Sequence, residues 1–168
     1  MAIIITASTN YTLGAGEDNL QLTGSADVNG TGNAGNNFLT GNDGANVLIG
    51  GAGGDFLLGG AGDDILIGNV DSVTADAEAD YLNGEDGNDI IYLTGRDMTD
   101  SGAGADTYWV MTGRNNHIWD TGTDTSVDVV KTYTSVTMGS FNFDTSKPYA
   151  MIYDGIERVE LQGTANLS

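Results

Sequence analysis

An alternation of polar and apolar residues repeats every nine positions along the first half of the chain. Each nine-residue frame has six residues that are mostly Gly, Asn, Asp or Ala, followed by three that are mostly apolar. Four frames run without a gap, at 32–40, 41–49, 50–58 and 59–67. The pattern returns at 84–92 and 101–109, with a partial frame at 80–83. Such internal repetition predicts a repeat architecture built from one small structural unit.

The two parts of a frame predict a corner and a strand. Glycine at positions one, two and four can adopt positive φ and form a tight corner whose carbonyls point the same way. The last three residues predict a short strand whose middle side chain points inward. These middle residues, which we expect to form the core, are Leu39, Leu48, Leu57, Leu66, Leu82, Ile91 and Tyr108.

The frames together predict an all-β fold, a right-handed parallel β-roll (a β-solenoid) with flanking β-strand caps. With two frames in each coil, corners two frames apart stack on the same side. We expect amino-terminal cap strands over 1–29, the roll over 30–109, and a carboxyl-terminal β segment over 110–168 that closes its end. At 168 residues the chain suits a single domain.

Two stretches, 68–79 and 93–100, break the nine-residue period. Each can be a loop insertion or a degenerate half-coil, and the choice changes which aspartates face one another. The acids in and beside these stretches are either additional metal ligands or solvated loop residues. They are Asp71, Asp76, Glu78, Asp97 and Asp100.

The end of the chain resembles its beginning. Residues 20–28 are similar to 159–167, and residues 10–15 are similar to 135–140. Residues 127–138 have the β-branched composition of a longer strand. The repeated blocks indicate one unit of a longer tandem array, so we expect neighbouring repeats of a larger chain as partners.

The charge of the chain is strongly negative. Asp and Glu number 24 against five Lys and Arg, and between Asp55 and Asp106 thirteen carboxylates face only Arg96. This charge argues against nucleic acid as a partner and indicates that cations are bound. The chain has no cysteine, and no apolar stretch approaches the roughly 18 residues of a membrane span. Ile3 to Ile5 is too short an apolar run for a signal peptide.

The sixth residue of every frame has a short side chain that carries an oxygen. Ca²⁺ takes about six to eight oxygens from carboxylates and carbonyls. Zinc is disfavoured because the chain has one His and no Cys to act as ligands. Mg²⁺ is disfavoured because it requires near-ideal octahedral coordination. We therefore expect several calcium ions, each shared between stacked corners, and no other cofactor. The predicted ligands are Asn37, Asn46, Gly51, Gly53, Asp55, Gly60, Gly62, Asp64, Asp80, Gly87, Asp89, Gly102, Gly104 and Asp106.

The frames resemble the repeats-in-toxin (RTX), or hemolysin-type, calcium-binding β-roll, and residues 50–67 fit its consensus at every defining position. The resemblance implies a module of a large surface protein or adhesin that is secreted by a type I route and folded by calcium outside the cell. Charge repulsion and the ordering entropy of glycine independently predict that the calcium-free chain is largely unfolded. Asn37 and Asn46 lack the charge of Asp, which predicts weak calcium binding or a capping role there.

No catalytic constellation is evident, and we expect a protein that is not an enzyme. His117 is alone, and no Ser-His-Asp motif occurs. Two functions remain: a structural spacer, and a module that binds a carbohydrate or surface ligand with calcium as scaffold. Aromatic residues can form a glycan platform or pack over the end of the roll. They are Trp109, Trp119, Tyr133, Phe141 and Phe143.

Overall fold

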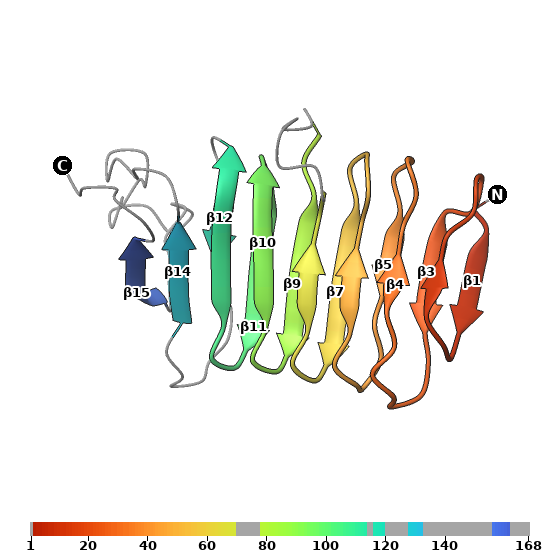
Figure 1. The fold of residues 1–168 in the computed structure, drawn as a ribbon, viewed down its shortest axis with the longest axis horizontal. Helices are drawn as coiled ribbons and strands as arrows, with labels where there is room; N and C mark the ends of the chain where they lie inside the picture. Colours follow the sequence, from red (N-terminus) through yellow and green to blue (C-terminus); the bar gives the residue numbers. More distant parts are fainter. Residues whose placement is uncertain (1, 70–77, 114–115, 120–127, 133–155, 162–168) are drawn as a thin grey trace.

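The computed structural model describes residues 2–69, 78–113, 116–119, 128–132 and 156–161, and in this part every regular element is a β-strand. The strands form two sheets, and consecutive strands from β1 to β14 alternate between them (Figure 1). The seven-stranded sheet contains β1 (Ile4–Ala7), β3 (Asn19–Leu22), β5 (Phe38–Thr40), β7 (Phe56–Ala61), β9 (Tyr81–Asp86), β11 (Met98–Ala103) and β13 (His117–Trp119). The eight-stranded sheet contains β15 (Ile156–Leu161), β14 (Asp128–Thr132), β12 (Thr107–Gly113), β10 (Ile90–Gly95), β8 (Ile65–Ile67), β6 (Val47–Ile49), β4 (Gly30–Thr31) and β2 (Tyr11–Thr12).

All strand pairs in both sheets are parallel, and their register follows the nine-residue frames. Phe38 pairs with Phe56 in one sheet, and Val47 pairs with Ile65 in the other. Residues two frames apart are therefore neighbours, so each coil consists of two frames. This confirms the predicted β-roll and the stacking of corners two frames apart. No described helix is long and apolar enough to cross a membrane.

Inward apolar side chains of the two sheets fill the interior, and the eighth residues of the frames form one column in each sheet. All seven side chains that were expected in the core are fully buried, at 0% exposure. The amino-terminal strands continue the same columns, because Leu20 on β3 lies in register with Leu39. At β11 the inward position is held by Thr99, which is also fully buried. The core is thus one residue thick from each side, and its stability depends on coil-to-coil stacking.

The two irregular stretches have different structures. Strand β9 follows β8 in the normal alternation, and a coil there spans 25 residues instead of 18, so 68–79 lengthens one connection by seven residues. Residues 93–100 instead supply the end of β10 and the start of β11, in a coil of 17 residues. The first break therefore adds seven residues to the connection between β8 and β9, as an insertion does, and the second is a half-coil. The spacing alone could not separate these two cases.

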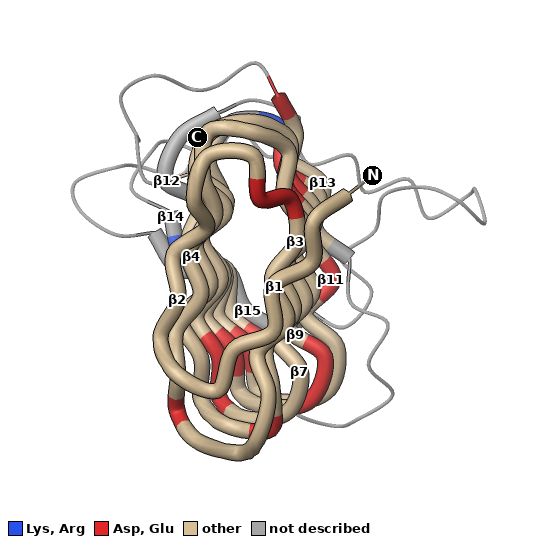
Figure 2. Tube along the Cα trace, turned by 90° about the vertical axis from the view of Figure 1, so that its right-hand side faces the viewer, with Lys and Arg blue, Asp and Glu red and all other residues tan. Residues whose placement is uncertain are grey.

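The strands expected as caps at either end belong to the same two sheets. β1 and β2 are the edge strands at one end, and β13 and β15 are those at the other. Strand β14 lies within the strand expected over 127–138, of which 127 and 133–138 fall outside the described residues. Viewed along the axis of the roll, the Asp and Glu residues gather mainly at the turns between the sheets (Figure 2).

Candidate metal centre

The corners form two stacks, one at each end of the strands. The lower corners, at the bottom of Figure 1, follow the strands of the seven-stranded sheet, and the upper corners follow those of the eight-stranded sheet. The lower corners are 23–28, 41–46, 59–64, 84–89 and 101–106. The upper corners are 14–18, 32–37, 50–55 and the connections that end at Asp80 and Asp97. From residue 32 onward, each of these corners ends at a short polar residue directly before a strand, which is the sixth residue in a regular frame.

The sixth residues form a buried ladder in each stack, held by hydrogen bonds between coils. In the lower stack the backbone N–H of Asp64 donates to Oδ1 of Asp89 at 2.8 Å. The N–H of Asp89 donates in turn to Oδ1 of Asp106 at 2.8 Å. In the upper stack the N–H of Asp55 donates to Oδ1 of Asp80 at 2.8 Å. One carboxylate oxygen of each of these acceptors therefore joins adjacent coils.

The second carboxylate oxygen is turned toward the first glycine of its own frame. The Oδ2 atoms of Asp64 and Asp89 are buried and have no hydrogen-bond partner. A Cβ atom built on Gly59 would collide with Oδ2 of Asp64 and would lie 2.5 Å from the carbonyl oxygen of Gly84 in the next coil. Because a partnerless buried carboxylate is costly, this cradle of oxygens from two coils is suited to a cation.

Glycine is required at the corners because of close approach between coils. Gly60 and Gly102 have φ of 109° and 96°, and a Cβ on either would collide with a carbonyl of the adjacent corner. The same position in frame 84–92 holds Glu85, the only described non-glycine residue with positive φ, at 71°. The carbonyls of one corner thus point at the backbone of the next, as the frame pattern predicts.

The buried aspartates of the lower corners are surrounded by other acids. Burial raises the pKa of Asp64 to about 7, a backbone hydrogen bond from Asn46 opposes the rise, and Asp63 and Glu85 add to it. Burial likewise raises the pKa of Asp89 to about 8, with Asp106 and Asp64 among the contributing charges. Without a cation, these carboxyls hold protons near neutral pH because the charged form is poorly solvated.

The raised pKa values predict that acid stabilises the calcium-free roll. A folded-state pKa above the unfolded value contributes stability below the unfolded pKa, and that stability is lost as pH rises through the folded pKa of about 7 to 8. In chelator, the β signal of the chain in far-ultraviolet circular dichroism should therefore rise as pH falls from 8.5 to about 5. The calcium concentration at half-saturation should rise over the same range, because protons compete for the carboxylates. A calcium affinity that does not vary with pH would contradict these assignments.

The residues of the corners fit calcium better than other metals. In the described part of the chain, no group of three or more His, Cys, Asp or Glu side chains could hold a metal ion. A site must therefore take backbone carbonyls together with Asp, an all-oxygen set that suits Ca²⁺. The orphaned Oδ2 atoms of Asp64 and Asp89, with the glycine cradles beside them, meet this requirement in the corners 59–64 and 84–89. Zinc chemistry has no support from these residues.

The structure distributes the predicted ligands between the two stacks. Those at the upper corners are Asn37, Gly51, Gly53, Asp55 and Asp80. Those at the lower corners are Asn46, Gly60, Gly62, Asp64, Gly87, Asp89, Gly102, Gly104 and Asp106. The glycines approach the preceding corner through backbone contacts, and the sixth-position residues are all buried. Which of them contact an ion stays a prediction.

Further members of the two ladders were missed as sixth-position residues. Asp97 and Asn116 continue the upper ladder, because Oδ1 of Asp97 accepts the N–H of Asp80 at 3.3 Å and Oδ1 of Asn116 accepts the N–H of Asp97 at 2.9 Å. Asp128 continues the lower ladder by accepting the N–H of Asp106 at 2.9 Å. The available signal was a short polar residue directly before a strand or, for Asp128, at the first position of one. The irregular spacing of these residues concealed it.

The other acids considered as ligands lie in varied places. Asp100 is buried on β11, in register with Asn83 of β9, while Glu78 is exposed. Asp71 and Asp76 lie outside the described residues. Of the ligands considered at the breaks, Asp97 alone is a described member of a sixth-position ladder.

The aromatic residues considered as a glycan platform are only partly described. Trp109 lies on the outer face of its sheet. Its ring is stacked with that of Tyr92, with the two ring centroids 6.3 Å apart, and Nζ of Lys131 lies 5.1 Å from the centroid of the Trp109 ring. Trp109 therefore does not cover the end of the roll. His117 pairs in register with Met98 at the outer face of β13. Tyr133, Phe141 and Phe143 lie outside the described residues, as does the side chain of Trp119.

Comparison with known proteins agrees with the geometry. The family model described as the RTX calcium-binding nonapeptide repeat matches four copies, over residues 31–66 and 67–95. Searches of the curated proteins and of the solved structures give no significant match. The matched residues include both complete frames with orphaned aspartates and the lengthened connection between them. Residues 31–95 of this chain therefore match the RTX calcium-binding repeat, and the structure places them in a β-roll.

Proposed function

We propose that the chain is a structural module in which several calcium ions bind between stacked corners and hold the coils of the roll together outside the cell. The observation that carries the proposal is the pair of buried Oδ2 atoms on Asp64 and Asp89, which face glycine cradles and have no partner. The repeat family is a structural, non-catalytic module that binds calcium. In this proposal calcium has a structural role, in which it joins adjacent coils, and not a catalytic one.

The mechanism follows from charge and proximity. Asp64 and Asp89 lie in adjacent coils, and their carboxylates repel each other and the nearby acids. A divalent cation between the corners replaces this repulsion with attraction to oxygens of both coils. Because each coil contacts only its neighbours, stabilising one gap favours folding of the next, which predicts cooperative binding. Folding free energy and calcium affinity are then linked.

Neutralising one carboxylate without changing its shape tests the proposal. In Asp89→Asn the Oδ1 acceptor is kept, but one charge leaves the ligand set. We expect the calcium concentration at the folding midpoint to rise by about tenfold, because ligand charge tunes affinity over decades. Asp43→Asn is the control, since Asp43 carries the same charge at an exposed corner position. Equal midpoints for the two variants would overturn the role given to Asp89.

Secretion and the larger context are further parts of the proposal. RTX repeats occur in proteins exported by type I secretion, which supports an extracellular or cell-surface location. Low calcium inside the cell would keep the acidic coils unfolded for export, and high calcium outside would fold them. The similarity of residues 20–28 to 159–167 supports a unit of a tandem array, as in adhesins. Neighbouring units of the same chain are then the expected partners, with no nucleic acid and no membrane insertion.

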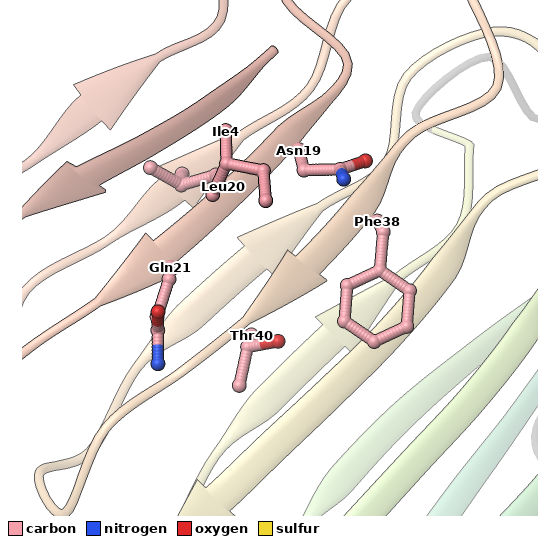
Figure 3. A pocket seen from close by; sticks show the side chains of 6 residues that line it. All are labelled: Ile4, Asn19, Leu20, Gln21, Phe38 and Thr40. Carbon is pink, nitrogen blue, oxygen red and sulfur yellow. The ribbon is translucent and has the colours of Figure 1, made fainter. Parts of the chain in front are cut away.

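A hollow on the outer face of the seven-stranded sheet favours glycan binding as a second candidate function. Phe38, Phe56 and Tyr81 stack in one column, with ring centroids 5.0 Å and 4.5 Å apart. Since Phe56 covers one face of Phe38, the opposite face borders a hollow of about 250 Å³ on the side of β3 (Figure 3). Its lining is Ile4, Asn19, Leu20, Gln21, Phe38 and Thr40. One aromatic face with uncharged amide and hydroxyl groups suits a neutral sugar ring.

Two substitutions distinguish the possible glycan surfaces. If the hollow binds sugar, Phe38→Ala should abolish binding to a panel of neutral oligosaccharides, while Trp109→Ala should leave it unchanged. The reason is that the Trp109 ring is already covered by Tyr92 and Lys131. Calorimetry in saturating calcium measures both variants. Absence of binding by the wild-type chain would leave the structural role as the function.

A further inference from the structure

Asparagine replaces glycine and aspartate at two positions of the first two frames. In frames 32–40 and 41–49, positions two and six are Asn33 with Asn37, and Asn42 with Asn46. In the next two frames the same positions hold glycine and aspartate. The side-chain hydrogen bonds of the four asparagines show what this exchange does.

In the upper stack, the amide nitrogens donate to carbonyls of the preceding corner. Nδ2 of Asn33 donates to the carbonyls of Gly14 at 2.8 Å and Glu17 at 2.7 Å. Nδ2 of Asn37 donates to the carbonyl of Asp18 at 3.2 Å. Oδ1 of Asn37 accepts the N–H of Asn33 at 2.7 Å. Both amides are therefore used within the protein.

The lower stack repeats this arrangement one frame later. Nδ2 of Asn42 donates to the carbonyls of Thr23 at 3.2 Å and Ala26 at 3.1 Å. Nδ2 of Asn46 donates to the carbonyl of Val28 at 2.7 Å, and Oδ1 of Asn46 accepts the N–H of Asn42 at 2.8 Å. The same pattern of amide-to-carbonyl hydrogen bonds therefore occurs in both stacks, which indicates that it is a specific property of these two frames.

The amide groups meet the need that a cation meets later in the chain. Inward carbonyls of a corner require either a positive ion or N–H donors. Asn33 and Asn42 supply such donors, whereas Gly51 and Gly60 at the same position have no side chain. The charges change at the same point: residues 29–54 contain one acid, Asp43, and residues 55–106 contain thirteen.

We propose that residues 4–49 form a calcium-independent cap, in which asparagine amides take the place of metal ions, and that the acidic coils fold onto this cap when calcium binds. The roles of Asn37 and Asn46 are then hydrogen bonding and not metal coordination. The first part of the proposal stands without calcium, and the second part rests on the proposed function.

The cap presents a template to the coils that depend on calcium. Strands β5 and β6 pair with β7 and β8, so the ordered cap offers one strand edge in each sheet. The N–H of Asn46 already donates to Oδ1 of Asp64 at 2.7 Å, which joins the last amide corner to the first orphaned carboxylate. A preformed edge removes the cost of nucleating the first coil, since each added coil needs only its neighbour.

Hydrogen exchange of the full-length chain, measured by mass spectrometry with chelator and with calcium, tests both parts. We expect peptides from 38–49 to be protected in both conditions, and peptides from 81–110 to gain at least tenfold protection with calcium. Fast exchange of 38–49 in chelator would overturn the cap. Calcium-independent exchange of 81–110 would overturn the proposed function and leave the cap intact.

A matched pair of substitutions tests the amide mechanism itself. Asn42→Asp removes the donor to the carbonyls of Thr23 and Ala26 and places a charge beside them. We expect protection of 38–49 in chelator to fall at least tenfold. Asn36→Asp adds the same charge at an exposed position and keeps the Oδ1 acceptor for the N–H of Gly54, so its protection should stay at the wild-type level. Equal loss in the two variants would refute the amide mechanism.

Discussion

Gly84→Ala should abolish the calcium-driven folding of residues 81–110 at calcium concentrations that fold the wild type. The new Cβ would collide with Oδ2 of Asp89 and lie 2.5 Å from the carbonyl oxygen of Ser101. It would fill the space in which these oxygens face each other and would push adjacent coils apart. We expect a loss of about 3 kcal/mol or more, because backbone cannot relax as a flexible side chain can. Calcium titration followed by far-ultraviolet circular dichroism measures the effect.

Gly14→Ala is the matched control, since its Cβ would make only ordinary contact, 3.5 Å from Oε2 of Glu17. Its calcium midpoint should equal that of the wild type. If Gly84→Ala also titrated like the wild type, the cradle at Gly84 would have no part in binding or stacking.

Leu57→Ala should cost about 2 to 5 kcal/mol of unfolding free energy in saturating calcium, as expected for a large-to-small change in a core. Leu57 is fully buried between Leu39 and Leu82 of the adjacent coils. The core is one side chain thick on each sheet, so no second layer can fill the cavity. Urea denaturation in calcium measures the loss.

The neighbouring residue provides the control. Leu58 has the same size but lies partly buried on the outer face of the sheet. Leu58→Ala should cost about 1 kcal/mol or less. Similar losses for the two variants would mean that calcium, and not the apolar column, carries most of the stability.

The fold was predictable because the frame encodes the backbone directly. Glycines at fixed positions require close-approaching corners, and the inward residue at position eight requires a strand with one buried face. Leu39 and Leu48 are therefore buried in the core as expected, and the aspartates at position six are buried at the corners. Where the frame is complete, local sequence determines both the corner and its chemistry.

What the sequence left open depended on spacing and on hydrogen-bond direction. The inward residues on either side of the breaks at 68–79 and 93–100 are separated by similar numbers of residues. Yet the first break lengthens a connection, and the second is a half-coil. Asp97 and Asp128 lie in the ladders without a glycine frame before them. The role of Asn42 depends on where its amide nitrogen points, which a residue name does not specify.

The measurement that tests the account most directly is a calcium titration of the chelator-treated wild-type chain, followed by far-ultraviolet circular dichroism, with magnesium as the control. We predict a residual β signal from the cap in chelator, then a steep gain with calcium and little gain with magnesium. A spectrum that responds to neither ion would contradict the central claim that calcium holds the acidic coils of this roll together.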